Sequence, residues 1–213
     1  MEWRLNHGAC LALWALWCVL HSAFAGPATA AGRPLGGGRG DGYRLAYNLV
    51  SLLTLLPLAA WTLAIDTDPL FRWAGPLRAA QAVLVATGGV LFAAGARQYP
   101  LGAFLGIARG DRNDEKNGRP FVTRGVLGAI RHPWYAGGIL VLWAREASAF
   151  GLALNLLLSA YFVAGAFHEE QTLLRRYGEA YRRYREEVSM FFPWKWLRRR
   201  LRRRGNPGGA NGA

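Results

Sequence analysis

The stretch Phe121–Gly138, FVTRGVLGAIRHPWYAGG, decides the fold of this chain, because apolar segments of membrane type precede it and further apolar segments follow it. Its centre, Arg131-His132, puts a guanidinium and an imidazole directly before Pro133, a residue type favoured at the first position of a helix. The apolar run Trp134–Ala144 supplies that helix. Donors at a helix N-terminus suit a carboxylate or a phosphate, but the same residues also fit an interfacial cap on a membrane helix. Both interpretations stay open at this point.

The turn that follows has space for a ligand. Tyr135 lies three residues after His132, so both side chains can face one side of the helix. Gly137 and Gly138 carry no side chain and leave room for a flat group to approach the backbone.

Composition places the chain among membrane proteins. Its 213 residues suit one domain, 52% of them are hydrophobic and nine are tryptophan. The net charge of +13 lies beside long apolar runs, which favours anionic lipid over nucleic acid as the partner. Cys10 and Cys18 share one apolar segment and give neither a metal-ligand spacing nor a disulfide framework. We therefore expect no metal and no nucleic acid.

Apolar segments predict an all-α, polytopic integral membrane protein with about five transmembrane helices. The first segment ends in Ala23-Phe24-Ala25, which also fits a signal-peptide cleavage site, although the acidic Glu2 favours a retained helix. The fourth is short unless it begins near Val126 and accommodates Arg131-His132. The last two form a helical hairpin with a charged tip at Arg145-Glu146. The expected spans are Gly8–Ala25, Leu45–Ile65, Ala79–Ala96, Pro133–Ala144 and Ala147–Phe167.

Basic residues set the expected orientation. The segments Gly26–Tyr43, Asp66–Leu77 and Arg97–Arg124 are predicted loops, because they are rich in glycine, proline or charge. With alternating spans, 22 of the 26 Lys and Arg residues fall on the side of the Arg131-His132 motif and the C-terminus. The positive-inside rule then makes that side cytoplasmic and puts the N-terminus outside. We expect a multi-pass protein of the cell inner membrane.

The C-terminal part combines an amphipathic helix with a polybasic tail. Apolar and aromatic residues recur there at spacings of three and four, which predicts an interfacial helix lying on anionic headgroups. The tail carries few apolar residues, so we expect it to be disordered. The stripe comprises Leu174, Tyr177, Tyr181, Tyr184 and Val188. The expected organisation is N-terminal helices over residues 1–120, a core over 121–196 and the tail over 197–213.

Glu169 and Glu170 follow the last span on the same expected side as Arg131 and His132. Carboxylates beside such donors suit a zwitterion with a further positive centre, and S-adenosylmethionine is such a molecule. Methyl transfer needs alignment and exclusion of water, and it needs no metal. The alternative is a solvated helix turn whose two acids pair with the arginines at positions 175 and 176.

An ordered series of short motifs runs through the second half of the chain. It comprises Phe121 and Gly125, Arg131-His132-Pro133-x-Tyr135-x-Gly137, Glu169-Glu170-x-x-Leu173, Tyr177-Gly178-x-x-Tyr181-x-x-Tyr184, and Val188 and Pro193. The series resembles the isoprenylcysteine carboxyl methyltransferase and phospholipid methyltransferase superfamily. With His21-Ser22 and Tyr43-Arg44-x-x-Tyr47-Asn48, the chain looks like the bacterial branch that contains methanethiol S-methyltransferase and denitrification-associated membrane proteins.

The resemblance implies S-adenosylmethionine as the cofactor, held at the cytoplasmic end of the last hairpin. It implies His132 and Glu170 as catalytic residues and brings His21, otherwise an interfacial side chain, near the active site. The cofactor-binding residues that it implies are Arg131, His132, Tyr135, Gly137, Glu169, Glu170, Tyr181 and Arg182.

We therefore expect a membrane-embedded methyltransferase dependent on S-adenosylmethionine. Its acceptor is a small thiol like methanethiol or a membrane-partitioned molecule, and a thiol would have to lose its proton because the thiolate is the nucleophile. Three alternatives stay open: isoprenylcysteine or phospholipid methylation, a non-catalytic denitrification-associated membrane protein, and a nucleic-acid-binding tail at Leu197–Arg204. The methyl acceptor, the general base and the oligomeric state stay open as well.

Overall fold

Helices make up almost all of the structure. The computed structural model describes residues 2–30, 40–65, 67–98, 102 and 123–205. In these ranges it has no strand, which confirms the predicted all-α class. The elements are α1 (Glu2–Ala30), α2 (Gly40–Ala64), α3 (Leu77–Ala96), the 3₁₀ turn η1 (Gly125–Gly128), α6 (Pro133–Trp143), α7 (Ala149–Tyr177), α8 (Glu179–Glu187) and α9 (Trp194–Gly205).

Four of these helices are long and apolar enough to cross a membrane, within the ranges that the structure describes. They expose large apolar side chains, such as Leu53 at 68% and Leu63 at 76%, which suits contact with lipid rather than water. The predicted polytopic membrane fold is therefore confirmed. The four spans are Asn6–Ala25 in α1, Gly42–Ala64 in α2, Leu77–Ala96 in α3 and Ala149–Tyr177 in α7.

The fifth predicted span is shorter than a membrane. α6 has 11 residues and begins at Pro133, not near Val126. At about 1.5 Å per residue it covers roughly half of a hydrocarbon core. The helix cannot begin earlier, because the backbone N–H groups of Arg131 and His132 donate to carbonyls beyond α8. The predicted count of five is therefore four long helices and one short one in the described part of the chain.

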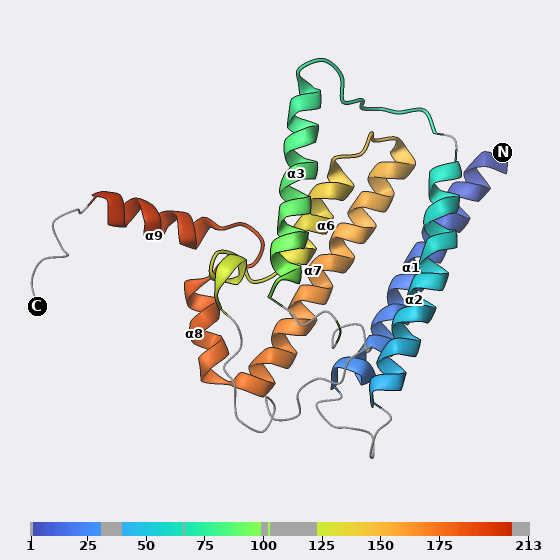
Figure 1. The fold of residues 1–213 in the computed structure, drawn as a ribbon. Helices are drawn as coiled ribbons and strands as arrows, with labels where there is room; N and C mark the ends of the chain where they lie inside the picture. The colour runs from blue at the N-terminus through green and yellow to red at the C-terminus, as the bar shows by residue number, and fades with distance from the viewer. Residues whose placement is uncertain (1, 31–39, 66, 99–101, 103–122, 206–213) are drawn as a thin grey trace, which may run out of the picture.

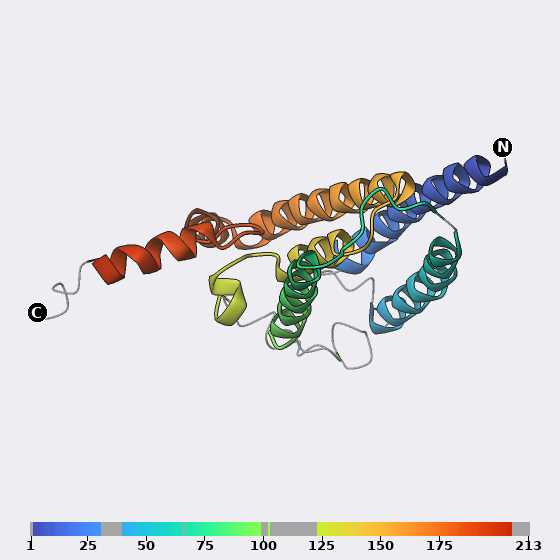
Figure 2. The same cartoon turned by 90° about the horizontal axis from the view of Figure 1, so that it is seen from above.

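α7 is the central helix. It contacts α1 and α6 along its length and α8 at its C-terminal end. The pairs α1–α2 and α3–α6 lie on either side of it, as Figure 1 shows, and Figure 2 shows the same pairs from above. α9 projects away from the bundle in both views. The predicted α6–α7 hairpin thus joins the N-terminal helices to the C-terminal segments.

Hydrogen bonds fix the register of α1 against α2. The indole nitrogen of Trp14 donates to Thr62 Oγ1 at 2.8 Å, and that of Trp17 donates to Thr54 Oγ1 at 3.0 Å. Leu154 of α7, 1% exposed, packs into the same core. In an apolar surrounding, polar bonds between helices hold one alignment because any other would leave these groups unpaired.

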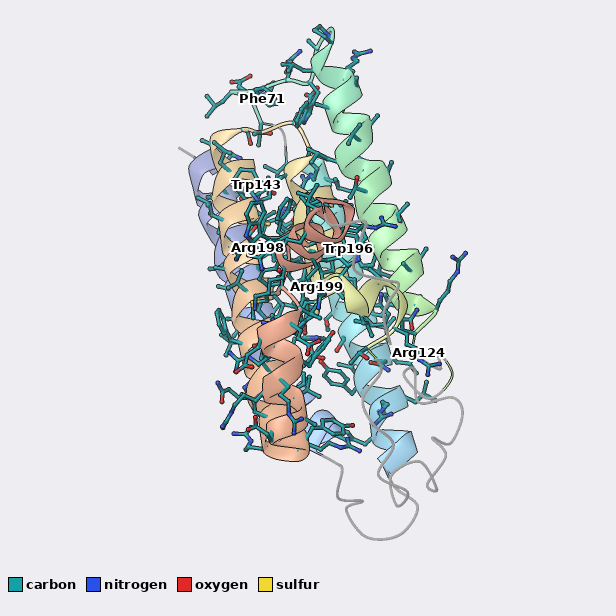
Figure 3. All side chains as sticks on the ribbon, turned by 90° about the vertical axis from the view of Figure 1, so that its left-hand side faces the viewer. Phe71, Arg124, Trp143, Trp196, Arg198 and Arg199 are labelled. Carbon is teal, nitrogen blue, oxygen red and sulfur yellow. The ribbon has the colours of Figure 1, made fainter. Side chains whose placement is uncertain are left out.

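The loop between α2 and α3 closes over the tip of the hairpin. Phe71 and Ala147 exchange backbone hydrogen bonds of 3.0 and 3.1 Å, and the indole of Trp73 donates to Arg145 O at 3.2 Å. Ser148 then begins α7, because its hydroxyl accepts the N–H of Gly151 at 3.0 Å. The loop and the tip share one end of the bundle, marked by Phe71 in Figure 3, as an alternating arrangement of spans requires.

The C-terminal part differs from the prediction in four ways. α7 does not end at Phe167 but continues to Tyr177, so that Glu169 and Glu170 lie within a helix. Gly178, with φ 53°, then separates α7 from α8, a conformation that glycine adopts without a steric penalty. The predicted single amphipathic helix is therefore two helices.

The aromatic stripe of α8 faces protein rather than headgroups. Tyr181, Tyr184 and Val188 are 2%, 8% and 4% exposed and form a cluster with residues of the last turns of α7. The interfacial interpretation of this stripe is wrong, because α8 folds back onto the end of α7. The tail also differs, since α9 is helical to Gly205, where disorder is predicted from Leu197 onward. Residues 206–213 and the domain boundary at residue 120 lie outside the described residues.

Close packing of α3 on α6 depends on glycines. A Cβ on Gly88 would lie 2.7 Å from Val141 Cγ2 and 3.0 Å from Gly137 O, whereas a Cβ on Gly89 would meet nothing within 4 Å. Small residues at such a contact allow two helix backbones to approach.

Gly88→Ala should therefore destabilise the protein relative to Gly89→Ala. We expect a loss of about 1–3 kcal/mol from overpacking at position 88 and a gain of up to about 1 kcal/mol in helix propensity at position 89. Thermal unfolding of the two purified variants in the same detergent measures the difference. Equal stability of the two would contradict the α3–α6 contact.

Candidate functional site

The Arg131-His132 motif is held in place by the segment that follows α8. The backbone N–H of Arg131 donates to Ser189 O at 2.9 Å, and that of His132 donates to Met190 O at 3.1 Å. The hydroxyl of Tyr184 donates to Leu127 O at 2.7 Å. The turn before α6 is thus attached to the end of α8, although the two are far apart in the sequence.

The guanidinium of Arg131 is fully engaged within the protein. Its Nε and Nη2 both lie 2.7 Å from Glu170 Oε1. Its Nη1 donates to the carbonyl oxygens of Arg185, at 3.1 Å, and of Val188. The side chain is 8% exposed. Arg131 therefore joins the motif, α7 and α8, and it has little capacity left to receive an external carboxylate.

Glu170 is the centre of these contacts. It is 1% exposed, and besides Arg131 it lies 3.3 Å from His132 Nε2 and 3.0 Å from Arg185 Nε. A buried carboxylate needs such partners, because an unpaired charge in this surrounding would cost several kcal/mol. The predicted proximity of the motif to the two glutamates is observed, and Glu170 faces protein groups.

Glu169 differs from its neighbour in exposure. Its side chain is 44% exposed, and its Oε2 lies 3.6 Å from His132 Nδ1. Consecutive residues point about 100° apart on a helix, so only one of the two acids can face the interior. Glu169 is therefore the carboxylate of the pair that a ligand can reach.

Tyr135 adjoins the motif, and Gly137 does not. The Tyr135 ring stacks on the His132 ring with centroids 5.5 Å apart. Gly137 is buried against α3, where an added Cβ would lie 2.9 Å from Gly88 O. The space that the sequence predicts beside Gly137 and Gly138 is filled by α3 and by Phe162 of α7.

The two predicted residues of α8 have different surroundings. Tyr181 is 2% exposed, and burial together with the charge of Glu170 raises the pKa of its hydroxyl above the ordinary value. Its role in the structure is packing. Arg182 is exposed, and its Nη1 lies 3.3 Å from Glu179 Oε2. Arg182 therefore pairs with Glu179 rather than with Glu169.

His21 lies in a second polar group, between α1 and α2. Its Nδ1 is 3.1 Å from Ser51 Oγ, and the Tyr47 hydroxyl lies 2.9 Å from its Nε2. The ring stacks on Trp17 at 4.5 Å. A cavity of about 640 Å³ adjoins this group, and its walls are otherwise mostly apolar side chains of α1 and α2.

Aromatic rings connect the two groups. Tyr161 and Phe162 of α7 lie between them, with centroid distances of 6.5 Å from His21 to Tyr161 and 6.0 Å from Tyr161 to Phe162. Phe162 is 5.9 Å from Tyr135, which stacks on His132. His21 is thus not in the motif cluster but at the other end of this series of rings.

Two contributors were missed in the sequence. Arg185, which contacts Glu170, is one of several arginines of α8, and the sequence pattern alone does not distinguish it from them. Tyr161 is one apolar-looking residue in a long span. Of the two, only Arg185 could have been suggested by the sequence pattern. It lies one residue after Tyr184, which is buried, and so near the inner face of α8.

The fold and the cluster define this chain as a polytopic α-helical membrane protein with a polar cluster at the end of a helical hairpin. No family model and no solved structure matches the chain. It is 34% identical over 97 residues to methanethiol S-methyltransferase 2 of Bradyrhizobium diazoefficiens, a match that covers 45% of this chain and 38% of that protein. It is 36% identical over 66 residues to the methanethiol S-methyltransferase of Mycobacterium tuberculosis, a match that covers 30% of this chain and 27% of that protein.

A Pseudomonas methanethiol S-methyltransferase is 37% identical over 65 residues, with 25% of its length covered. The chain therefore covers 38% or less of the length of these curated relatives. The matches confirm the predicted resemblance to the bacterial methanethiol S-methyltransferase-like branch of the isoprenylcysteine methyltransferase family.

The His132 imidazole gives the cluster a pH dependence. Burial lowers its pKa, but hydrogen bonds to Glu169 and Glu170 and their negative charges raise it by more, so it lies above the ordinary value of about 6.5. A group whose pKa is raised on folding stabilises the folded state below the unfolded pKa, and this contribution is lost as the pH rises through the folded value.

Thermal stability in detergent should therefore fall between roughly pH 6.5 and the higher folded pKa of His132. His132→Gln should flatten this part of the profile, whereas His168→Gln, at an exposed position of α7, should leave it unchanged. Melting temperatures from acidic to alkaline pH measure the effect. A profile of His132→Gln that matches the wild type would show that the imidazole is not coupled to the glutamates.

Proposed function

We propose that this chain is a membrane-embedded, S-adenosylmethionine-dependent methyltransferase that acts on a small, methanethiol-like thiol or another membrane-partitioned acceptor. One observation carries the proposal. Arg131, His132 and the Glu169-Glu170 pair come from distant segments and form one cluster at the end of the hairpin. The similarity to methanethiol S-methyltransferases supports the same activity. We place the cluster on the cytoplasmic side of the inner membrane, where the positive-inside rule puts it.

The exposed part of the cluster fits the cofactor. S-adenosylmethionine supplies an activated methyl group on a sulfonium, together with an ammonium, a carboxylate and ribose hydroxyls. Glu169 offers a half-exposed carboxylate for the ammonium or the hydroxyls, and the Tyr135 ring offers an aromatic face for positive charge. Glu170 and Arg131 would hold His132 and α7 in position rather than bind the cofactor, because their polar atoms already contact protein groups.

The cavity beside His21 is the proposed acceptor site. Its lining of Leu13, Leu16, Leu20 and other apolar side chains suits a molecule that partitions into lipid, and these leucines are 44%, 51% and 46% exposed on the outer face of α1. Such a surface is open to the bilayer. A thiol seated there would meet the His21 imidazole and the Tyr47 hydroxyl as its polar partners.

In the proposed reaction the thiol S–H bond breaks, and the methyl group moves from the cofactor sulfur to the thiolate sulfur. His21 is the candidate that accepts the thiol proton, since one ring nitrogen of a neutral imidazole is an acceptor. The products are a methyl thioether and the demethylated, uncharged thioether form of the cofactor. The aromatic rings of Tyr161 and Phe162 lie between the two groups, and such apolar surface would limit the access of water to the reacting atoms.

Glu169→Gln should weaken binding of S-adenosylmethionine by about tenfold or more, because it removes a charge-assisted contact, while the melting temperature changes little at this half-exposed position. Calorimetric titration of the full chain in detergent measures it. Glu187→Gln is a matched control on α8, where the side chain is 70% exposed. Undiminished binding by Glu169→Gln would reject the role given to this carboxylate.

Membranes that contain the chain should transfer a labelled methyl group from S-adenosylmethionine to methanethiol. His21→Gln should lower the turnover by about a hundredfold, a typical loss for a general base, and leave cofactor binding unchanged. His168→Gln is the control at an exposed site. Cofactor binding without transfer to methanethiol, to isoprenylated cysteine or to aminophospholipid would favour a non-catalytic membrane protein, and transfer to either lipid class would reassign the acceptor.

A further inference from the structure

A second cavity lies at the junction of α8 and α9, and Arg131 is among the residues that line it. Its volume is about 540 Å³. Four of its lining side chains are cations, Arg131, Arg182, Arg185 and Lys195, against one carboxylate, that of Glu186. The methyl-transfer proposal places neither the cofactor nor the acceptor in this cavity, although Arg131, which lines it, also holds His132 there. The charge of the cavity is opposite in kind to what a cationic cofactor needs.

The donors around the cavity are only partly used. Arg185 contacts Glu170 through its Nε. Its side chain is 35% exposed, so the Nη1 and Nη2 end of the guanidinium can reach a ligand. Lys195 donates from Nζ to Arg185 O at 2.8 Å, and an ammonium has two further N–H bonds. Arg182 contacts Glu179 at 3.3 Å, and its side chain is exposed. The cavity therefore combines fixed positive charge with remaining hydrogen-bond donors.

The fold holds this arrangement rigidly. The backbone N–H of Lys195 donates to Ser189 Oγ at 3.0 Å, and Ser189 pairs through its carbonyl with the motif turn. Lys195 is thus fixed at the first turn of α9 by a bond to the same segment that carries Arg131. Arg131 and Arg185 share the single carboxylate of Glu170, so positive charge exceeds negative charge around the cavity, and an anion bound there would stabilise the folded state.

We propose that this cavity binds a phosphate-bearing anion, either a free phosphate or the headgroup of an anionic phospholipid. Arginine and lysine donors suit phosphate oxygens. The lining favours the lipid source, because Trp194 lines the cavity, is 58% exposed and can contact acyl chains, and Phe192, two residues earlier in the chain, is 67% exposed. α9 continues from Trp194 with the basic residues of its remaining turns, as Figure 3 shows for Arg198 and Arg199.

S-adenosylmethionine is a poor occupant of the same cavity. It carries a net positive charge, which four surrounding cations repel, and its ammonium would find only Glu186 as a partner. A nucleic acid would need a longer basic surface than this one cavity. A compact dianion or a phosphodiester headgroup fits both the volume and the charge.

The test uses the full chain purified in detergent. The probes are inorganic phosphate, short-chain phosphatidylglycerol and short-chain phosphatidylcholine, titrated by calorimetry and by the shift in melting temperature. Lys195→Gln should weaken binding of the anionic probe by about tenfold, the loss expected for a charged hydrogen-bond donor. Arg198→Gln removes the same charge from α9 outside the cavity and should change binding less than about twofold.

Each outcome decides the proposal. Tight binding of phosphatidylglycerol with weak binding of phosphate identifies the lipid headgroup, and equal binding of both identifies the phosphate group itself. Lys195→Arg keeps the charge and should restore binding, which separates a lost donor from a lost fold. Equal losses in Lys195→Gln and Arg198→Gln, binding of phosphatidylcholine as tight as phosphatidylglycerol, or displacement of phosphate by S-adenosylmethionine would each overturn it. None of these readouts depends on methyl transfer.

Discussion

The buried carboxylate of Glu170 is the constraint on which the rest of this end of the bundle depends. At 1% exposure it must meet cations or hydrogen-bond donors, because an unpaired buried charge is strongly destabilising. Arg131 and His132 come from the turn before α6, and Arg185 comes from α8. One side chain of α7 thus draws together two segments that lie far from it in the sequence. The fold-back of α8 follows, and with it the burial of the aromatic face that α8 turns towards α7.

The two adjacent acids have different tasks because a helix presents neighbours in different directions. Glu170 faces inward and organises the cluster, and Glu169 faces the surface beside His132. The buried acid also orients the imidazole through Nε2, which leaves Nδ1 towards Glu169. A pair of acids therefore does not mean two ligand contacts. In this chain the buried Glu170 fixes the position of the exposed Glu169.

Hydropathy and residue type predicted the spans and the hairpin because lipid contact requires long apolar helices, whatever the neighbours are. The proximity of His132 to Glu169 and Glu170 followed from the same topology. The break at Gly178 could not be predicted, since glycine allows a turn without requiring one. The spacing of Tyr181 and Tyr184 is the same whether the stripe faces lipid headgroups or protein. Only the tertiary structure shows that it packs against α7. Gly137 was assigned to ligand space because the sequence does not show that α3 fills it.

The distance between the two polar groups constrains how they can work together. Under the proposed function the methyl group leaves a cofactor near His132 and reaches an acceptor near His21, and the rings of Tyr161 and Phe162 lie between these ends. Phe162 packs against Gly138, where a Cβ would lie 2.9 Å from the ring. Because Gly138 has no side chain, the Phe162 ring fills the space that a larger residue at position 138 would occupy. Under the proposed function, the position of the Phe162 ring therefore bears on whether the cluster and the cavity can act as one active site.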